Sequence, residues 1–381
     1  MHAQSMRIGF INSCGTYPPG IGSSAHAFQS VSGFIRHGHT VNALRGNYPW
    51  ASFRAYSPAA LIKFIRDTDV LYIRTFNGFA QDAHTLLKLL RPLSLPVVWE
   101  MNAPSYETRN IKGWFVGGAW KVLARLVDAS VCVSEEMRVY ARDVIGVRSV
   151  FVVPNGSDPE LFSPARRGQA ARDGLREDDF LVLWAGSSQY SWQGIEIILK
   201  VAEKTTQTNK KIKFLLIADP AFVGRKHVPD NVIIKPPVPY FSMPGYIASA
   251  DVCLCLYNSF AWSRIGFYMS PMKLFDYMSC ARPVIATDAG QISRVIRDQE
   301  NGLLTDNSPD DIAGKIMFLY ENRQRAREMG DAARRDVVDF YNWERGVVQT
   351  IRVLEAAIHR DLKTLQSQSG FRSDGQEGAA G

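Results

Sequence analysis

The sequence predicts an α/β protein built from two doubly wound domains. Short, nearly continuous apolar runs recur twelve times along the 381 residues, with amphipathic stretches between many of them. Strands that are apolar on both faces are typical of parallel sheets covered by helices on both sides. A turn-rich connector at residues 154–164 divides the runs into two sets of six. The chain length also predicts two domains, because 381 residues are more than a single domain with one hydrophobic core usually contains.

The expected strands of the first half are RIGFI, TVNAL, DVLYI, PVVWE, ASVCV and SVFVV, and those of the second half are FLVLW, IKFLLI, NVIIK, DVCLCL, PVIAT and GLLT. We therefore predict a first domain over residues 1–160 and a second over 161–342. A last helix, 343–365, is expected to pack back on the first domain, and the polar tail 366–381 to be disordered. In open parallel sheets, ligands bind beyond the carboxyl ends of the strands, so the chemistry is expected in the loops there.

Composition indicates a soluble cytoplasmic protein. Hydrophobic residues make up 46% and charged residues 21%, and no apolar run approaches the roughly 20 residues of a membrane span. The N-terminus lacks a secretory pattern, and five scattered cysteines favour a reducing compartment. Residues 1–165 carry 16 Lys and Arg against 11 Asp and Glu. This excess suits an anionic partner or simple solubility, and no motif supports nucleic acid.

One run, SPMKLFDYMSCARPVIATDAG from residue 270, carries the strongest signal. Ser270 is expected to cap a helix that starts at Pro271 and buries Leu274 with the residues three and four positions later. Lys273 and Asp276 share another face near the helix start. Free N–H groups there suit a diphosphate, and a carboxylate can accept ribose hydroxyls. A capped helix with a solvated Lys–Asp pair is the equal alternative.

This run resembles the donor-binding signature of family 4 (group 1) retaining glycosyltransferases, in the branch that reads Ser-Pro-x-Lys-Leu-Phe-Glu-Tyr-Met. The resemblance continues through GQISRVIRDQENGLL and covers nearly the whole chain to about residue 345. It implies the GT-B fold, with two Rossmann-like domains facing a cleft. It also implies a hexosyltransferase-type enzyme that moves a sugar from a UDP- or GDP-linked donor to a glycan or lipid-linked acceptor, with retention of anomeric configuration. Neither a cofactor nor a metal ion is expected, and polysaccharide biosynthesis is the implied pathway.

The resemblance assigns further donor contacts in the second domain. Ser187 and Gln193, in LWAGSSQYSWQGIEIIL, stand in a loop where many members carry Arg and Lys for the phosphates. The phosphates are therefore expected to depend on Lys273 and the helix N-terminus. Ser270, Leu274 and Asp276 are the other donor-binding residues that the resemblance implies in this run. Pro239 and Tyr240 resemble the loop beside the nucleobase, with a simple turn before a helix as the equal alternative.

Candidate catalytic residues lie in the first domain. Gly20 and Gly22 follow the first strand, where glycines let the backbone approach a phosphate or sugar closely, although a tight turn would need them too. The run VVWEMNAPSYETRN resembles an acceptor-side loop and offers Glu100, Asn102 and Glu107. Gly22, Glu100 and Arg74 are the candidate catalytic groups, with loop capping as the alternative for Glu100.

Departures from the family pattern keep two other interpretations open. Tyr268 stands where many members have the first of two Glu residues, so the sequence does not predict how the donor sugar is held. A nucleotide-sugar epimerase of the same fold and a non-catalytic accessory subunit are the alternatives. Residues 112–125 mix Trp and Phe with basic residues, which fits either a peripheral contact at the inner face of the membrane or a buried helix.

Overall fold

A computed structural model shows two compact units. The structure describes residues 5–12, 19, 22–43, 57–75, 83–90, 95–104, 111–168, 171–223, 227–258, 263 and 265–368. Unit 1 comprises Met1–Asn155, Trp262–Ser270 and Trp343–Gly381, and unit 2 comprises Gly156–Ala261 and Pro271–Asn342. The predicted limits differ in two places. Residues 156–160 belong to unit 2, and residues 262–270 belong to unit 1.

Unit 1 contains a six-stranded parallel sheet in the order β2-β1-β3-β4-β5-β6. Its strands are β1 (Arg7–Ile11), β2 (Thr40–Ala43), β3 (Val70–Thr75), β4 (Val97–Met101), β5 (Ala129–Cys132) and β6 (Val150–Val152). Its helices are α1 (Gly22–Arg36), α2 (Pro58–Arg66), η1 (Ala83–Leu90), α4 (Ile111–Ala124), α5 (Glu135–Val139), η2 (Tyr140–Ile145), α13 (Trp343–His359) and α14 (Leu362–Ser367). The strand order reverses between β1 and β3, where such sheets bind ligands.

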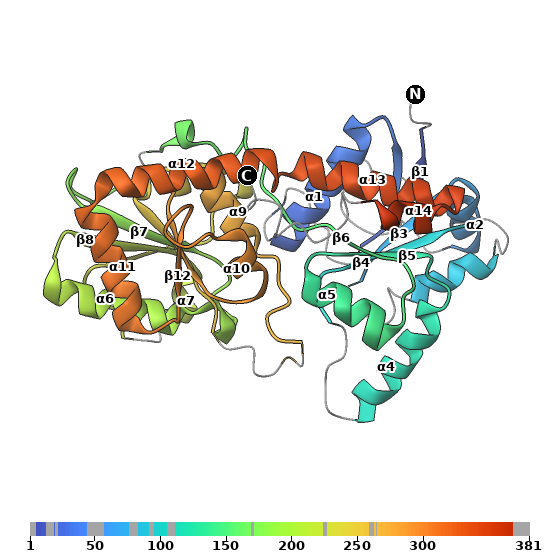
Figure 1. Ribbon diagram of the computed structural model, residues 1–381, viewed down its shortest axis with the longest axis horizontal. Helices are drawn as coiled ribbons and strands as arrows, with labels where there is room; N and C mark the ends of the chain where they lie inside the picture. Colours follow the sequence, from blue (N-terminus) through green and yellow to red (C-terminus); the bar gives the residue numbers. More distant parts are fainter. Residues whose placement is uncertain are drawn as a thin grey trace. The chain divides into compact units, whose positions relative to one another are not determined.

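The C-terminal helix α13 completes the core of unit 1 (Figure 1). It packs against α1, where Gly33 has no Cβ and Val347 occupies the space that a Cβ would need. The predicted helix 343–365 is thus two helices, because Arg360 takes a left-handed backbone conformation at φ 60° between α13 and α14. The tail predicted as disordered lies outside the described residues from residue 369 on.

Unit 2 contains a second parallel sheet, in the order β12-β11-β10-β7-β8-β9. Its strands are β7 (Phe180–Ala185), β8 (Ile212–Ile217), β9 (Val232–Lys235), β10 (Val252–Cys255), β11 (Val284–Thr287) and β12 (Leu303–Thr305). Its helices are η3 (Pro164–Arg166), η5 (Ser191–Gln193), α6 (Ile195–Thr208), α7 (Pro220–Val223), η6 (Tyr240–Ser242), α8 (Met243–Ser249), α9 (Met272–Ser279), α10 (Gly290–Val295), α11 (Pro309–Glu321) and α12 (Arg323–Asp339). The strand order reverses between β7 and β10, so this pair is the expected ligand edge.

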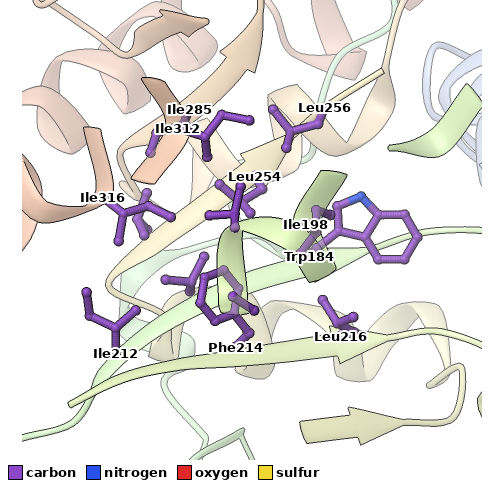
Figure 2. Close-up of a cluster of buried hydrophobic side chains, with 14 of the residues drawn as sticks. Trp184, Ile198, Ile212, Phe214, Leu216, Leu254, Leu256, Ile285, Ile312 and Ile316 are labelled. Carbon is purple, nitrogen blue, oxygen red and sulfur yellow. The ribbon is translucent and has the colours of Figure 1, made fainter. Parts of the chain in front are cut away.

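The core of unit 2 shows why its strands are apolar: their side chains are buried beneath helices. Figure 2 shows Phe214 and Leu254 on β8 and β10 facing Ile198 of α6 and Ile316 of α11, all of them fully buried. Helices therefore cover the sheet face that these strands present, and the strands remain apolar throughout. All twelve predicted strands are confirmed, with shifts of one or two residues at some ends. In the described part of the chain, no helix has the length and apolar character needed to cross a membrane.

Candidate active site

In unit 2, the ammonium of Lys273 lies at the edge where the strand order reverses. Lys273 is on the first turn of α9, and its Nζ lies 4.5 Å from the ring centroid of Trp184 on β7. It is also 5.6 Å from the ring of Tyr257, which follows β10. Among the described residues, no carboxylate forms an ion pair with it. Burial lowers the Lys273 pKa to about 8. The site therefore holds a partly desolvated cation near two aromatic rings, and an anion bound there would be electrostatically favourable.

The loop after β7 is shaped around this ammonium. Gln193 is buried, and its Oε1 accepts a hydrogen bond of 2.8 Å from Lys273 Nζ. A Cβ at Gly186 would lie only 2.6 Å from Nζ, so glycine leaves the space that the ammonium uses. Ser187 is exposed, whereas the Ser188 hydroxyl accepts a hydrogen bond from the Asp219 backbone. The loop thus brings Gln193 to Lys273, two predicted donor residues that are 80 positions apart.

Asp276 lies in a different environment from Lys273. The side chain is 8% exposed, and its Oδ1 accepts a 2.6 Å hydrogen bond from the hydroxyl of Ser157. Burial raises its pKa to about 8, although the Ser157 hydrogen bond opposes that rise. No hydrogen bond or ion pair joins it to Lys273 among the described residues. The solvated Lys–Asp pair considered as an alternative is therefore wrong, and the two side chains act separately.

The predicted cap of α9 is wrong. The helix starts at Met272 with Pro271 in the cap position, and no side chain caps it. The Ser270 hydroxyl instead accepts a 2.9 Å hydrogen bond from the Asn155 backbone, while the Asn155 amide donates to the Ser270 carbonyl. Ser270 therefore secures a connection within unit 1. The predicted apolar face of α9 is confirmed, since Leu274 is fully buried with Tyr277 and Met278.

The remaining predicted residues of the second domain have structural contacts of their own. Pro239 is exposed and precedes η6, and the Tyr240 ring lies 5.4 Å from the ring of Phe162, which is fully buried. Tyr268 is buried, and its carbonyl accepts a hydrogen bond from the hydroxyl of Ser134 within unit 1. Tyr240 therefore packs on the core of unit 2, and Tyr268 is held within unit 1 through its backbone.

In unit 1, the structure brings together two of the three candidate catalytic residues. Arg74 and Glu100 lie one residue before the ends of neighbouring strands β3 and β4, and Arg74 Nε lies 3.2 Å from Glu100 Oε1. Asn102 donates a 2.7 Å hydrogen bond to the same oxygen. Gly22 is exposed and begins α1, and Gly20 lies outside the described residues. The pair Arg74–Glu100 is thus a buried ion pair at the carboxyl edge of the sheet.

Sequence reasoning missed His26 as a member of this cluster. Its Nε2 lies 3.1 Å from Glu100 Oε1, and burial lowers the His26 pKa to about 3, so the imidazole is neutral. Burial opposes ionisation of Glu100, but His26 and Arg74 hold its pKa below the usual range. A lone histidine on an amphipathic helix gives no warning of this contact. The sequence indicates only that His26 lies four residues after the candidate Gly22, on the helix that follows the first strand.

Comparison with solved structures establishes the fold class of the chain. Both units are Rossmann-like, and solved structures that resemble the chain share this GT-B fold class. Sucrose-phosphate synthase of Thermosynechococcus elongatus aligns with TM-score 0.70 and 16% identity, covering 94% of this chain and 100% of that one. Anabaena HepE, in complex with UDP-glucose, aligns with TM-score 0.67 and 16% identity over 92% and 100%. At this identity the likeness establishes the fold alone.

Family models then identify the relatives. Residues 20–161 match the model of glycosyltransferase family 4, and residues 179–322 match that of glycosyl transferases group 1. Each model covers a little over a third of the chain, and both describe glycosyltransferases. A D-inositol 3-phosphate glycosyltransferase of Paenarthrobacter aurescens is 27% identical over 220 residues, 54% of this chain and 52% of its own length. The chain spans about half the length of the curated relatives that it matches.

Proposed function

We propose that the protein transfers a sugar from a nucleoside-diphosphate sugar to a glycan or lipid-linked acceptor, with retention of anomeric configuration. The observation that carries the proposal is the Lys273 ammonium. It is a partly buried cation without a carboxylate partner among the described residues, placed at the reversal point of a Rossmann-like sheet. Open α/β sheets bind nucleotides at this point, and a diphosphate would supply the missing negative charge.

The donor would be held by groups from one helix and one loop. The backbone N–H groups at the start of α9 and the Lys273 ammonium would bind the diphosphate, with Gln193 keeping the ammonium in place. Asp276 would accept the ribose hydroxyls with the part of its carboxyl group that Ser157 does not use. Pro239 and Tyr240 would lie beside the base. Anabaena HepE binds UDP-glucose, which makes a UDP-sugar the first donor to test.

The chemical task is to stabilise a departing diphosphate beside an oxocarbenium-like sugar. A fixed cation and oriented N–H groups do this where charge develops, and they need no reorganisation during the reaction. Lys273 would therefore act on the leaving group as well as on binding. Gly22, at the start of α1, would approach the reacting sugar through its backbone.

Glu100 has a different proposed role from proton transfer. Its pKa is held below the usual carboxyl range, and Arg74 neutralises it in a buried site. A strongly ionised, paired carboxylate is a weak base, so Glu100 would position groups on the acceptor side of the site rather than remove a proton.

The first experiment is a thermal-shift screen of the full chain against UDP-, GDP- and ADP-sugars, because a donor that binds the native state raises its apparent stability. A rise with one class of donor is expected for the wild type and a smaller one for Lys273→Met. No rise with any donor would contradict the proposal and favour the non-catalytic subunit.

Incubation of the protein with the donor alone then separates a transferase from an epimerase. A transferase leaves the sugar configuration unchanged in the absence of acceptor, whereas accumulation of an epimer would overturn the proposal. Proton NMR of the product formed with an acceptor reports the anomeric configuration, and inversion would refute retention.

A further inference from the structure

The cluster around Glu100 surrounds a small cavity inside unit 1. The cavity measures about 20 Å³, and its walls include His26 from α1, Tyr72 from β3, Glu100 from β4 and Trp343 from α13. A buried water needs about 10–15 Å³ and two to four polar partners. The volume therefore fits one water molecule and excludes a sugar or a nucleotide.

Three residues that line the cavity each carry a buried polar atom that lacks a hydrogen-bond partner among the described residues. These atoms are His26 Nδ1, Glu100 Oε2 and Trp343 Nε1, on side chains that are 7%, 1% and 5% exposed as residues. Buried polar atoms in native proteins are nearly always paired, either with protein or with ordered water. Three exceptions around a single cavity of water size point to a shared partner.

The hydrogen-bonding capacity of the three atoms is complementary. Glu100 is ionised and accepts only, so the 3.1 Å contact from His26 requires the proton on His26 Nε2. Because the imidazole is neutral, His26 Nδ1 is then an acceptor. Trp343 Nε1 can only donate. One donor and two acceptors are what one water molecule satisfies, with two hydrogens to give and a lone pair to receive.

We propose that unit 1 binds one structural water in this cavity, which accepts a hydrogen bond from Trp343 Nε1 and donates to Glu100 Oε2 and His26 Nδ1. The Tyr72 hydroxyl, which hydrogen-bonds to Glu100 and Thr350, also lines the cavity. The water joins α1, β4 and α13 and fixes His26 as the Nε2–H tautomer. His26 and Trp343 are thus positioning residues for Glu100, and the C-terminal helix helps to orient a carboxylate 243 positions earlier in the chain.

A crystal structure of the full chain, at a resolution that shows ordered water, tests the proposal directly. One isolated density peak is expected within about 2.7–3.2 Å of all three atoms. An empty cavity, or a protein group bonded to His26 Nδ1 instead, would overturn it. The result does not depend on enzymatic activity, so it stands or falls apart from the proposed function.

Nitrogen NMR of histidine-labelled protein provides the second measurement. His26 is expected as the neutral Nε2–H tautomer, and an Nδ1–H tautomer would refute the water bridge. Trp343→Phe keeps an aromatic ring beside His26, whose centroid lies 5.0 Å from that of Trp343, but removes the N–H donor. The His26 Nδ1 resonance should shift in this variant, and the water peak should weaken or disappear in its crystal structure.

The matched control is Trp99→Phe. Trp99 is also fully buried in unit 1, and its indole N–H donates 2.9 Å to the Thr85 hydroxyl, away from the cavity. This variant loses an indole hydrogen bond of the same kind and should leave the His26 resonance and the water peak unchanged. Equal effects of the two variants on His26 would show a general disturbance of packing and would contradict the proposal.

Discussion

Replacing Lys273 by Met should weaken the binding of UDP by roughly 10- to 150-fold at pH 7.5. The variant keeps the length of the side chain and its packing on Trp184 but loses the charged hydrogen-bond donor. A hydrogen bond to a charged group contributes about 1.5–3 kcal/mol, and each 1.4 kcal/mol is tenfold in affinity. Isothermal calorimetry measures the dissociation constant. Lys204→Met, which removes a more exposed lysine of unit 2, serves as the control and should bind as the wild type does.

The pH dependence makes this prediction sharper. The Lys273 pKa of about 8 lies below its ordinary value, so the free protein loses the ammonium as the pH rises above 8. A bound diphosphate favours the charged form, and binding at higher pH must then take up a proton. Affinity should fall by up to about tenfold per pH unit above pH 8. Lys273→Arg keeps its charge throughout this range and should remove the slope.

Two results would refute the reasoning. UDP binding by Lys273→Met with the wild-type dissociation constant would exclude a phosphate contact. A wild-type affinity that does not change between pH 7.5 and 9.5 would show that the ammonium is not titrating at the site. Proton uptake can be checked independently, because calorimetry in buffers of different ionisation enthalpy reports the number of protons bound.

Three further predictions concern stability. Asp276→Asn should stabilise the chain in thermal denaturation, more at pH 8 than at pH 5, because a carboxyl whose folded-state pKa is raised to about 8 loses stability as pH rises from about 4 to 8. The same substitution should weaken UDP binding. A variant with wild-type stability and wild-type UDP affinity would contradict the role of Asp276 as a buried carboxyl group that binds the ribose. Glu100→Gln should cost about 3–5 kcal/mol in urea unfolding by removing the carboxylate charge that pairs with the buried Arg74, and a loss below 1 kcal/mol would oppose this. His26→Gln should reduce the loss of unfolding free energy at acid pH. A histidine whose folded-state pKa is lowered to about 3 removes up to about 1.4 kcal/mol of stability per pH unit as the pH falls from 6.5. A variant whose unfolding free energy falls with pH as steeply as that of the wild type would argue against a buried neutral His26.

The fold could be predicted because its signal is local and repeated. Each strand is a short run that is apolar on both faces, and the turn-rich connector separates two sets of six. Even the buried face of α9 follows from helical spacing, with Leu274 and the residues three and four positions later fully buried. These patterns depend on neighbours within one element, which a single sequence displays.

Contacts between distant positions could not be predicted in the same way. Ser270 has the residue type and place of a helix cap, yet its hydroxyl bonds to Asn155, 115 positions earlier. Local propensity was overridden by a tertiary partner that no spacing rule shows. The same limit hid the contact between Gln193 and Lys273, although both were singled out as donor residues.

Charge balance explains why the first-domain site was only half predicted. Arg74 and Glu100 could be predicted because each lies near a strand end at the ligand edge of the sheet. Their burial then requires further partners, since a buried ion pair is tolerated only when its remaining hydrogen-bonding capacity is satisfied. His26 and Asn102 fill part of that requirement at Glu100 Oε1, while Oε2 has no hydrogen-bond partner among the described residues. A buried carboxylate in a predicted site is therefore a reason to search for a histidine, an amide and a water around it, even where the sequence shows only the carboxylate.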